Sequence, residues 1–164
     1  MRILIILVSL LFVNLTRAQS TFESTGNTSN WNLSSTWNAT IDNGDGDGVP
    51  DSDDHVIIRN LHTVNGLPPG AFTTCATLNI NSGGTLDLQN SNYELKVDNS
   101  GNSIIIDGTI QNGWLKPNNN ITITGSGTYT NVGLLKSNTP VYLDADITFD
   151  KPVKLYSSAR VYIE

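Results

Sequence analysis

An acidic, glycine-rich segment, NGDGDGVPDSDD at residues 43–54, carries the side chains best suited to chemistry. Its glycines alternate with carboxylates, which lets a short stretch of backbone curl around an ion. Calcium takes six to eight oxygen ligands from carboxylates, amides and backbone carbonyls, and this spacing supplies them from one segment. The sequence therefore predicts one calcium ion as a cofactor. The expected ligands are Asn43, Asp45, Asp47, the carbonyl of Val49, Asp51 and Asp54.

Charge repulsion within this segment favours a bound cation. Six of the 15 acidic residues lie in residues 42–54, and packing them together costs free energy unless a cation or open solvent relieves it. The alternative is a polar turn without metal, in which Asp53 or Asp54 accepts hydrogen bonds from turn amides. If a metal binds, we expect it to act as a structural clip that fixes an N-terminal cap onto the coils.

Tryptophan side chains are the candidate carbohydrate contacts. Trp31 and Trp37 lie six residues apart in a polar segment, and Trp114 lies in an NGWLK turn. Rings of this kind, with an apolar body and a polar N–H, suit a binding surface when they are exposed. The open end of a repetitive core also needs a large apolar cover, so Trp31 and Trp37 are alternatively a hydrophobic cap.

Nucleophile and base combinations are sparse in this sequence. The two histidines, His55 and His62, and the single cysteine, Cys75, lie in alternating segments typical of strands, and no serine elbow is present. Carboxylates that could cleave a polysaccharide are scattered over several segments. We therefore expect no intrinsic enzyme activity, and we expect Cys75 to be a small buried hydrophobe.

Short alternating segments separated by Gly, Asn, Asp and Ser must position these side chains. Three of them share a pattern of strand, turn, Gly-Thr and large apolar residue. The Gly-Thr pairs stand at 84–85, 108–109 and 127–128. Repeats of this length that contain only short strands are typical of β-solenoids. The expected strands are 55–59, 62–66, 76–88, 93–97, 103–110, 121–129, 141–149, 153–156 and 159–163.

We therefore predict an all-β fold, a right-handed parallel β-helix (β-solenoid) with an N-terminal cap. Apolar residues alternate inward along each strand, and glycines give the corners their left-handed backbone angles. An antiparallel β-sandwich is the alternative, because it also contains short strands at regular spacing. The expected core residues are Leu78, Ile80, Leu86, Leu88, Ile104, Ile106, Ile110, Ile121, Ile123 and Tyr129.

Residues 1–18 have the features of a secretory signal peptide. Arg2 precedes an apolar run at 3–13 that is too short to span a bilayer, and small residues precede Gln19. We expect residues 19–54 to form the cap with the acidic loop and residues 55–164 to form solenoid coils. The final strand ends directly before Glu164, so further coils or a partner are expected to cover that end. The expected location is secreted or cell surface.

The balance of charge narrows the range of partners. The chain has 9 basic and 15 acidic residues; without Arg2 and Arg17, 7 basic residues remain and the net charge is about −8. This charge argues against nucleic acid and anionic membranes. One cysteine excludes an internal disulfide, so a core, a metal or assembly must stabilise the chain. Surface glycans or other extracellular proteins are the expected partners.

The segments WNLSSTWN (31–38), GVPDSDDHVIIRNLHTVN (48–65) and CATLNINSGGTLDL (75–88) carry a family resemblance. They resemble the N-terminal segment of secreted β-helix, adhesin-like surface proteins of Bacteroidetes-type bacteria, and more loosely the G8 domain. The acidic loop resembles a calcium repeat of thrombospondin type 3 proteins, which pack without helices. The resemblance covers about residues 30–90 and implies a bacterial adhesin or a protein with polysaccharide-active modules.

Together these observations predict a secreted or cell-surface solenoid that acts as a calcium-stabilised structural or adhesion module. Two alternatives stay open from the sequence. One is a non-catalytic fragment of a β-helix polysaccharide lyase or hydrolase, whose catalytic coils lie outside this chain. The other is a carbohydrate-binding module that uses the tryptophans. Fold alone does not choose between them.

Overall fold

Parallel β-sheets stacked as a β-solenoid form the structure, which is a computed structural model. The secondary structure of the described residues is nearly all strand, with one short 3-10 helix. In the part of the chain that is described, the first and third strands pair antiparallel and the other strand pairs are parallel. The predicted solenoid is therefore confirmed over the antiparallel sandwich. The described residues are 19–26, 29–44, 46–66, 73–90, 92–137, 139–144, 147–149, 151, 154–156 and 160–163.

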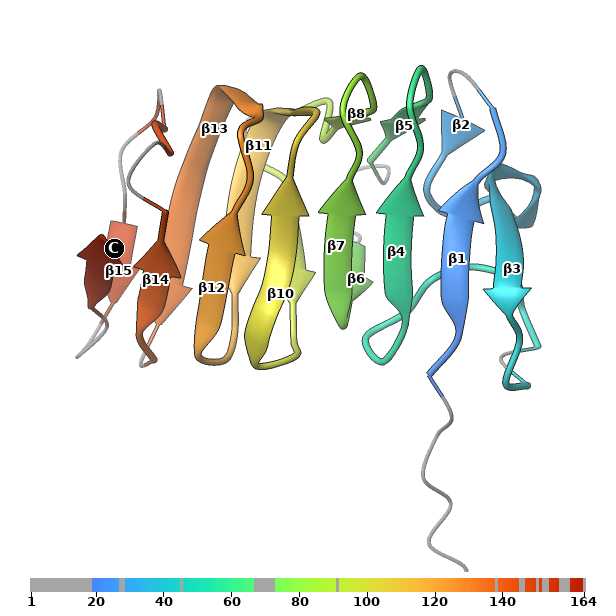
Figure 1. Cartoon of the computed structure of the whole chain (residues 1–164), viewed down its shortest axis with the longest axis horizontal. Helices are drawn as coiled ribbons and strands as arrows, with labels where there is room; N and C mark the ends of the chain where they lie inside the picture. Colours follow the sequence, from blue (N-terminus) through green and yellow to red (C-terminus); the bar gives the residue numbers. More distant parts are fainter. Residues whose placement is uncertain are drawn as a thin grey trace, which may run out of the picture.

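The first sheet, sheet A, is a row of eight strands, which Figure 1 shows side by side in the front layer. From its C-terminal edge to its N-terminal edge the strands stand in reverse chain order, except that the last two strands of the row are exchanged. The strands are β16 (Val161–Ile163), β14 (Val141–Leu143), β12 (Ile121–Thr124), β10 (Gly101–Ile106), β7 (Thr77–Ile80), β4 (His55–Ile58), β1 (Thr21–Ser24) and β3 (Trp37–Ile41).

The second sheet, sheet B, lies behind the first in Figure 1. Two of its strands, β6 (Thr73–Cys75) and β9 (Glu94–Val97), lie off its main row and pair with each other, and β9 also pairs with residues 114–117. A short 3-10 helix, η1 (Ser34–Thr36), precedes β3. The main row of sheet B is β15 (Lys154–Tyr156), β13 (Thr128–Ser137), β11 (Thr109–Pro117), β8 (Thr85–Asp87), β5 (Thr63–Asn65) and β2 (Ser29–Asn30).

Alternation along the strands builds the core, as predicted. Each of the ten residues expected in the core has an exposed fraction of 6% or less. They stack in register: Leu78 pairs with Ile104, which pairs with Ile123. Cys75 is also fully buried, and this burial raises the pKa of its thiol. The interpretation of Cys75 as a buried hydrophobe is confirmed.

The Gly-Thr pairs align on successive coils, and the glycines of these pairs have a steric role that was not predicted. Gly84, Gly108 and Gly127 do not have positive φ. A Cβ on Gly108 would lie 2.3 Å from the carbonyl oxygen of Gly84, and one on Gly127 would lie 2.3 Å from that of Gly108. These positions need glycine because adjacent coils approach too closely for a side chain. The predicted left-handed backbone angles are found at the turn glycines Gly83 (φ 78) and Gly125 (φ 109).

Several boundaries differ from the expected ones. Trp114, expected in a turn, lies within β11, and β13 continues beyond residue 129, where the expected strand ended. β1 pairs parallel with β4, and β2 pairs parallel with β5. The parallel stack therefore reaches into residues 19–54, which were expected to form only the cap. In the expected strand at 141–149, the described strand is limited to Val141–Leu143. The expected signal peptide, residues 1–18, lies outside the described residues, and no helix within them is long and apolar enough to cross a membrane.

Candidate functional site

Two tryptophans close the N-terminal end of the core. Trp31 directly follows β2, and Trp37 begins β3. Their ring centroids lie 5.0 Å apart with the ring planes at 75°, an edge-to-face contact that favours aromatic pairs. The Nε1–H of Trp37 donates to the carbonyl oxygen of Trp31 at 2.6 Å, and that of Trp31 donates to the carbonyl of Pro50 at 3.4 Å. Both indoles are therefore packed and hydrogen-bonded as a plug.

The burial of these rings corrects one prediction. Trp31 is 1% exposed and Trp37 is 6% exposed, so neither ring offers a face on which a sugar could stack. Their assignment as carbohydrate contacts is wrong, and the hydrophobic-cap alternative describes them. Trp114 is half-buried. Its ring lies directly against the backbone of Gly133, with Lys151 Nζ 5.6 Å from the ring centroid, so the chain's own groups occupy much of its surface.

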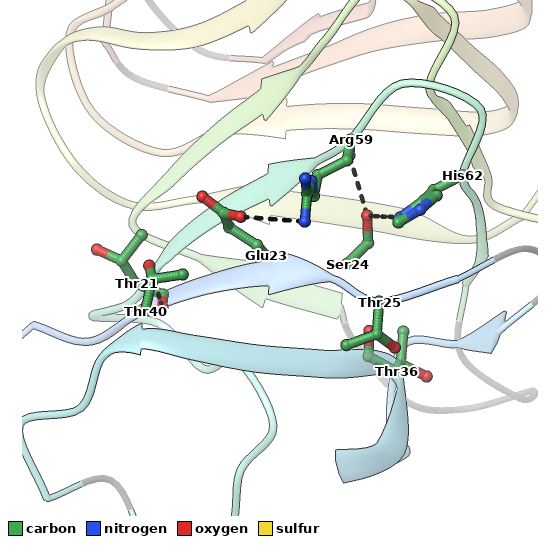
Figure 2. Close-up of polar contacts among 8 residues, drawn as sticks. All are labelled: Thr21, Glu23, Ser24, Thr25, Thr36, Thr40, Arg59 and His62. Atoms are coloured by element: carbon green, nitrogen blue, oxygen red, sulfur yellow. Dashed lines mark hydrogen bonds and ion pairs between the residues drawn. The ribbon is translucent and has the colours of Figure 1, made fainter.

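A polar cluster ties β1 to the next coil, as Figure 2 shows. Ser24 Oγ accepts the backbone N–H of Arg59 at 2.9 Å and lies 2.8 Å from Nδ1 of His62. Because the Arg59 amide already donates to this oxygen, the hydroxyl hydrogen can point at Nδ1 of His62, with the ring proton on Nε2. Glu23 and Arg59 form an ion pair at 3.8 Å beside it.

This serine–histidine contact is structural in its geometry. A nucleophilic serine needs an adjacent base, but it must also reach a substrate. Ser24 is 1% exposed, and its oxygen accepts a backbone amide from the neighbouring coil. The contact therefore satisfies a buried hydroxyl and connects β1 with the turn that precedes β5.

Threonine hydroxyls connect β3 and the turn before it to β1 and its C-terminal end, as Figure 2 also shows. Thr25 donates its hydroxyl to the carbonyl of Thr36 at 3.1 Å, and its backbone N–H donates to the same oxygen at 2.9 Å. Thr40 donates its hydroxyl to the carbonyl of Thr21 at 3.3 Å. The antiparallel strand β3 is thus held at both ends, and it ends the sheet.

The acidic loop uses its carboxylates for its own backbone. Asp42 Oδ1 accepts the N–H of Gly44 at 2.9 Å, and Asp47 Oδ1 accepts that of Val49 at 2.8 Å. Asp51 Oδ1 accepts the N–H two residues on at 3.1 Å. Contacts from an Asp side chain to the amide two residues later form Asx turns. These three carboxylates therefore shape the loop directly.

Asp54 is the buried anchor of the loop, with an exposed fraction of 2%. Its Oδ1 accepts the backbone N–H of Ser20 at 3.0 Å, and its Oδ2 accepts that of Asp51 at 2.9 Å. Its carbonyl accepts the N–H of Ala76 at 2.7 Å. Burial raises the pKa of this carboxyl, against the lowering effect of the two amides. Asp54 thus joins β1, the loop and the next coil, which the turn alternative had anticipated.

The predicted calcium ligands are only partly brought together. Asp51 and Asp54 are in contact, whereas the Nδ2–H of Asn43 donates to the carbonyl of Gln19 at 2.6 Å. Asp45 lies outside the described residues. Within the residues that are described, three or more acidic, histidine or cysteine side chains do not gather where they could hold a metal. The described ligands alone do not fit a calcium centre, and calcium binding stays a prediction.

Sequence reasoning missed the outward face of sheet A. Residues that alternate with the core form a column across five strands, in register from β1 to β12. A groove of about 320 Å³ crosses this face over β1, β4, β7 and β10. The alternation in HVII, TLNI and SIII predicted these side chains to point outward, but not what they form together. The column is Glu23, Ile57, Asn79, Ile105 and Thr124.

Comparison with protein-family models, curated proteins and solved structures found no match to this chain. The resemblance to secreted β-helix proteins therefore stays a prediction, and the geometry of the coils is the basis for assigning a function.

Proposed function

We propose that this chain is a secreted or cell-surface β-solenoid that serves as a structural and adhesive module. One observation carries the proposal: the coils form a continuous parallel stack whose N-terminal end is closed by the Trp31–Trp37 plug and the antiparallel strand β3. Such a stack holds outward side chains at a fixed spacing along an extended surface, which suits solenoids to binding. Its function would then come from the surface it presents.

The cap supports a role for residues 19–54 as the starting unit of the solenoid. A coil in the middle of the stack has neighbours on both sides, whereas the first coil needs a cover for its core and a partner for its edge. Trp31 and Trp37 supply the cover, and β3 supplies the partner for β1. Asp54 then fixes β1 to the next coil. We propose that this unit sets the register of the later coils.

Calcium stabilisation of the cap is a further part of the proposal. Six acidic residues within 42–54 support it, because their repulsion would be relieved by a cation. The hydrogen bond that Asp47 accepts does not use all of its carboxylate lone pairs, because a carboxylate can accept several partners. Calcium would act there as a structural clip between the cap and the coils.

Adhesion is tested with beads that display the chain from Gln19 onward. We expect retention on films of extracellular polymers, either polysaccharide or protein, above that of beads carrying an unrelated acidic protein. The same protein is incubated with the polysaccharides, and new reducing ends are measured. Retention on none of the films would overturn the adhesive role, and release of reducing ends would overturn the non-enzymatic role.

Export is tested separately by expressing the full chain with its first 18 residues in a secreting host. Sequencing of the exported protein should begin at Gln19. A protein retained in the cell with residues 1–18 attached would contradict the proposed location.

A further inference from the structure

We propose that the outer face of sheet A binds an uncharged polysaccharide, laid across the strands along the direction in which the coils stack. The inference rests on the proposed adhesive function and names its surface and its ligand class. It replaces the tryptophans, whose rings are buried or covered, as the candidate carbohydrate contact.

Two columns of outward side chains run across this face. In the first, Thr21 pairs with His55 and His55 pairs with Thr77. In the second, Glu23 pairs with Ile57, Ile57 with Asn79 and Asn79 with Ile105. Adjacent parallel strands lie about 4.8 Å apart, and alternate residues of one strand about 6.6 Å apart. The face is therefore a regular grid in which hydroxyl, imidazole and amide groups stand beside aliphatic side chains.

The groove gives this grid a concave floor. It has a volume of about 320 Å³ and is lined on its outer side by Thr21, His55, Ile57, Thr77, Asn79 and Ile105. Binding sites for small ligands combine apolar lining with a few placed polar groups. A sugar ring presents hydroxyls at its edge and C–H groups on its faces, so it can hydrogen-bond to the threonines and the amide while it packs on the isoleucines.

His55 is held in place on this face before any ligand arrives. Its Nδ1 lies 2.7 Å from Oγ1 of Thr77, and its Nε2 lies 3.2 Å from Oε1 of Gln19. Contacts at both ring nitrogens fix the imidazole as a wall of the groove. A polar group that is already ordered loses less conformational entropy on binding.

The charge of the face selects the class of ligand. The whole chain has a net charge of −6, yet the groove lining contains no carboxylate, lysine or arginine among its described residues. Glu23, at the β1 end of the second column, lies outside the groove lining and forms an ion pair with Arg59. The outward face of sheet B carries more charge, at Asp87, Glu94, Lys96 and Lys116. Depletion of charge marks the centre of binding surfaces. An anionic polysaccharide would be repelled by the acidic chain, whereas a neutral one is not.

The column continues beyond the groove, which favours a long ligand. Ile105 pairs with Thr124 on β12, and on the same strand Thr122 pairs with Tyr142, which pairs with Tyr162. The two tyrosine rings stack with centroids 5.1 Å apart, and Tyr162 is 40% exposed. A protein partner would need a larger patch with aromatic anchors at its centre. Here the centre is small and mixes polar with aliphatic side chains, and the aromatic rings lie at one end.

The test measures retardation of the full mature chain in native gels that contain a neutral β-glucan, mannan or xylan, with anionic polygalacturonate as the charged comparison. Asn79→Lys and Ile105→Lys place a charge in the groove on outward, half-buried positions. Thr85→Lys and Thr109→Lys place the same charge on equivalent positions of sheet B. Thermal unfolding of all four variants checks that the fold is kept. Binding to at least one neutral polymer should weaken by about tenfold or more in the first pair, and the second pair should match the wild type.

Three outcomes overturn the inference. Equal binding by all four variants would place the site elsewhere and leave the adhesive role intact. Binding to polygalacturonate alone would refute the neutral ligand. Retention of the beads on protein films, with no retardation by any polysaccharide, would replace the glycan with a protein partner. If the wild-type beads were retained on none of the films, the proposed adhesive function itself would fall, and the inference with it.

Discussion

Replacing Trp37 with alanine tests whether the aromatic pair is a structural plug. The indole is 6% exposed, so nearly its whole side chain would leave a cavity at the N-terminal end of the core. Truncation of a buried Trp costs about 3–5 kcal/mol of unfolding free energy. The carbonyl of Trp31 also loses its donor, and the edge-to-face contact, worth about 0.5–1.5 kcal/mol, is lost. We therefore expect a loss toward the upper end of that range.

The assay is denaturant unfolding of the mature chain, followed by circular dichroism because the substitution removes a fluorophore. Leu33→Ala is the matched control, since Leu33 lies in the same cap but is 47% exposed and should cost within about 0.5 kcal/mol. Trp37→Phe keeps an aromatic ring and should fall between the two. A loss below about 1 kcal/mol for Trp37→Ala would refute the plug. If polysaccharide binding were lost without loss of stability, the corrected carbohydrate role would return.

Three further predictions concern the coils and the loop. Gly108→Ala should destabilise the fold by about 1–3 kcal/mol or more, because its Cβ would lie 2.3 Å from the carbonyl oxygen of Gly84. Gly46→Ala is the control and should be near neutral, because a Cβ there has nothing within 4 Å. Equal urea midpoints for the two variants would contradict the close approach of the coils. Calcium added to chelator-stripped protein should raise the melting temperature; an unchanged temperature with no heat in calorimetry would remove the ion. Burial raises the pKa of Asp54, so the folded state binds the carboxyl proton more tightly than the unfolded state does. The resulting contribution to the free energy of unfolding is fully present below pH 3.8 and is lost as pH rises through the folded-state pKa. The stability advantage of wild type over Asp54→Asn should therefore shrink as pH rises through that window, and an advantage that widens would show that the amides outweigh burial.

The repetitive part of the fold was predictable because its signals are local. Period-two alternation placed residues such as Leu78 and Ile104 inward, and the Gly-Thr pairs marked equivalent positions on successive coils. The role of Gly108 was not predictable in the same way. A steric limit between coils depends on a carbonyl 24 residues earlier, and the sequence reveals only that glycine recurs.

The cap was harder to predict because its contacts span long distances in the sequence. β3 has the burial pattern Beeee, so it lacks the alternation that identifies a half-buried strand. Asp54 hydrogen-bonds Ser20 across 34 residues, and no local pattern distinguishes it from Asp53. From the sequence alone the two tryptophans could be either exposed carbohydrate contacts or a buried hydrophobic plug, and only their burial in the structure distinguishes these roles.

Whether or not calcium binds, the position of the acidic loop indicates that its negative charge protects an exposed strand edge from pairing. β3 is the last strand of sheet A, its residues 38–41 are exposed, and Ile41 is 53% exposed. An exposed edge strand can pair with another copy unless charge or geometry prevents it. Asp42 directly follows β3, and Asp47 lines a hollow of about 280 Å³ shared with Ala39 of that strand. Replacing both aspartates with asparagine should therefore increase concentration-dependent self-association in light scattering. The double variant Asp107→Asn with Asp144→Asn changes the net charge equally away from this edge, so equal association by the two variants would assign the effect to net charge alone.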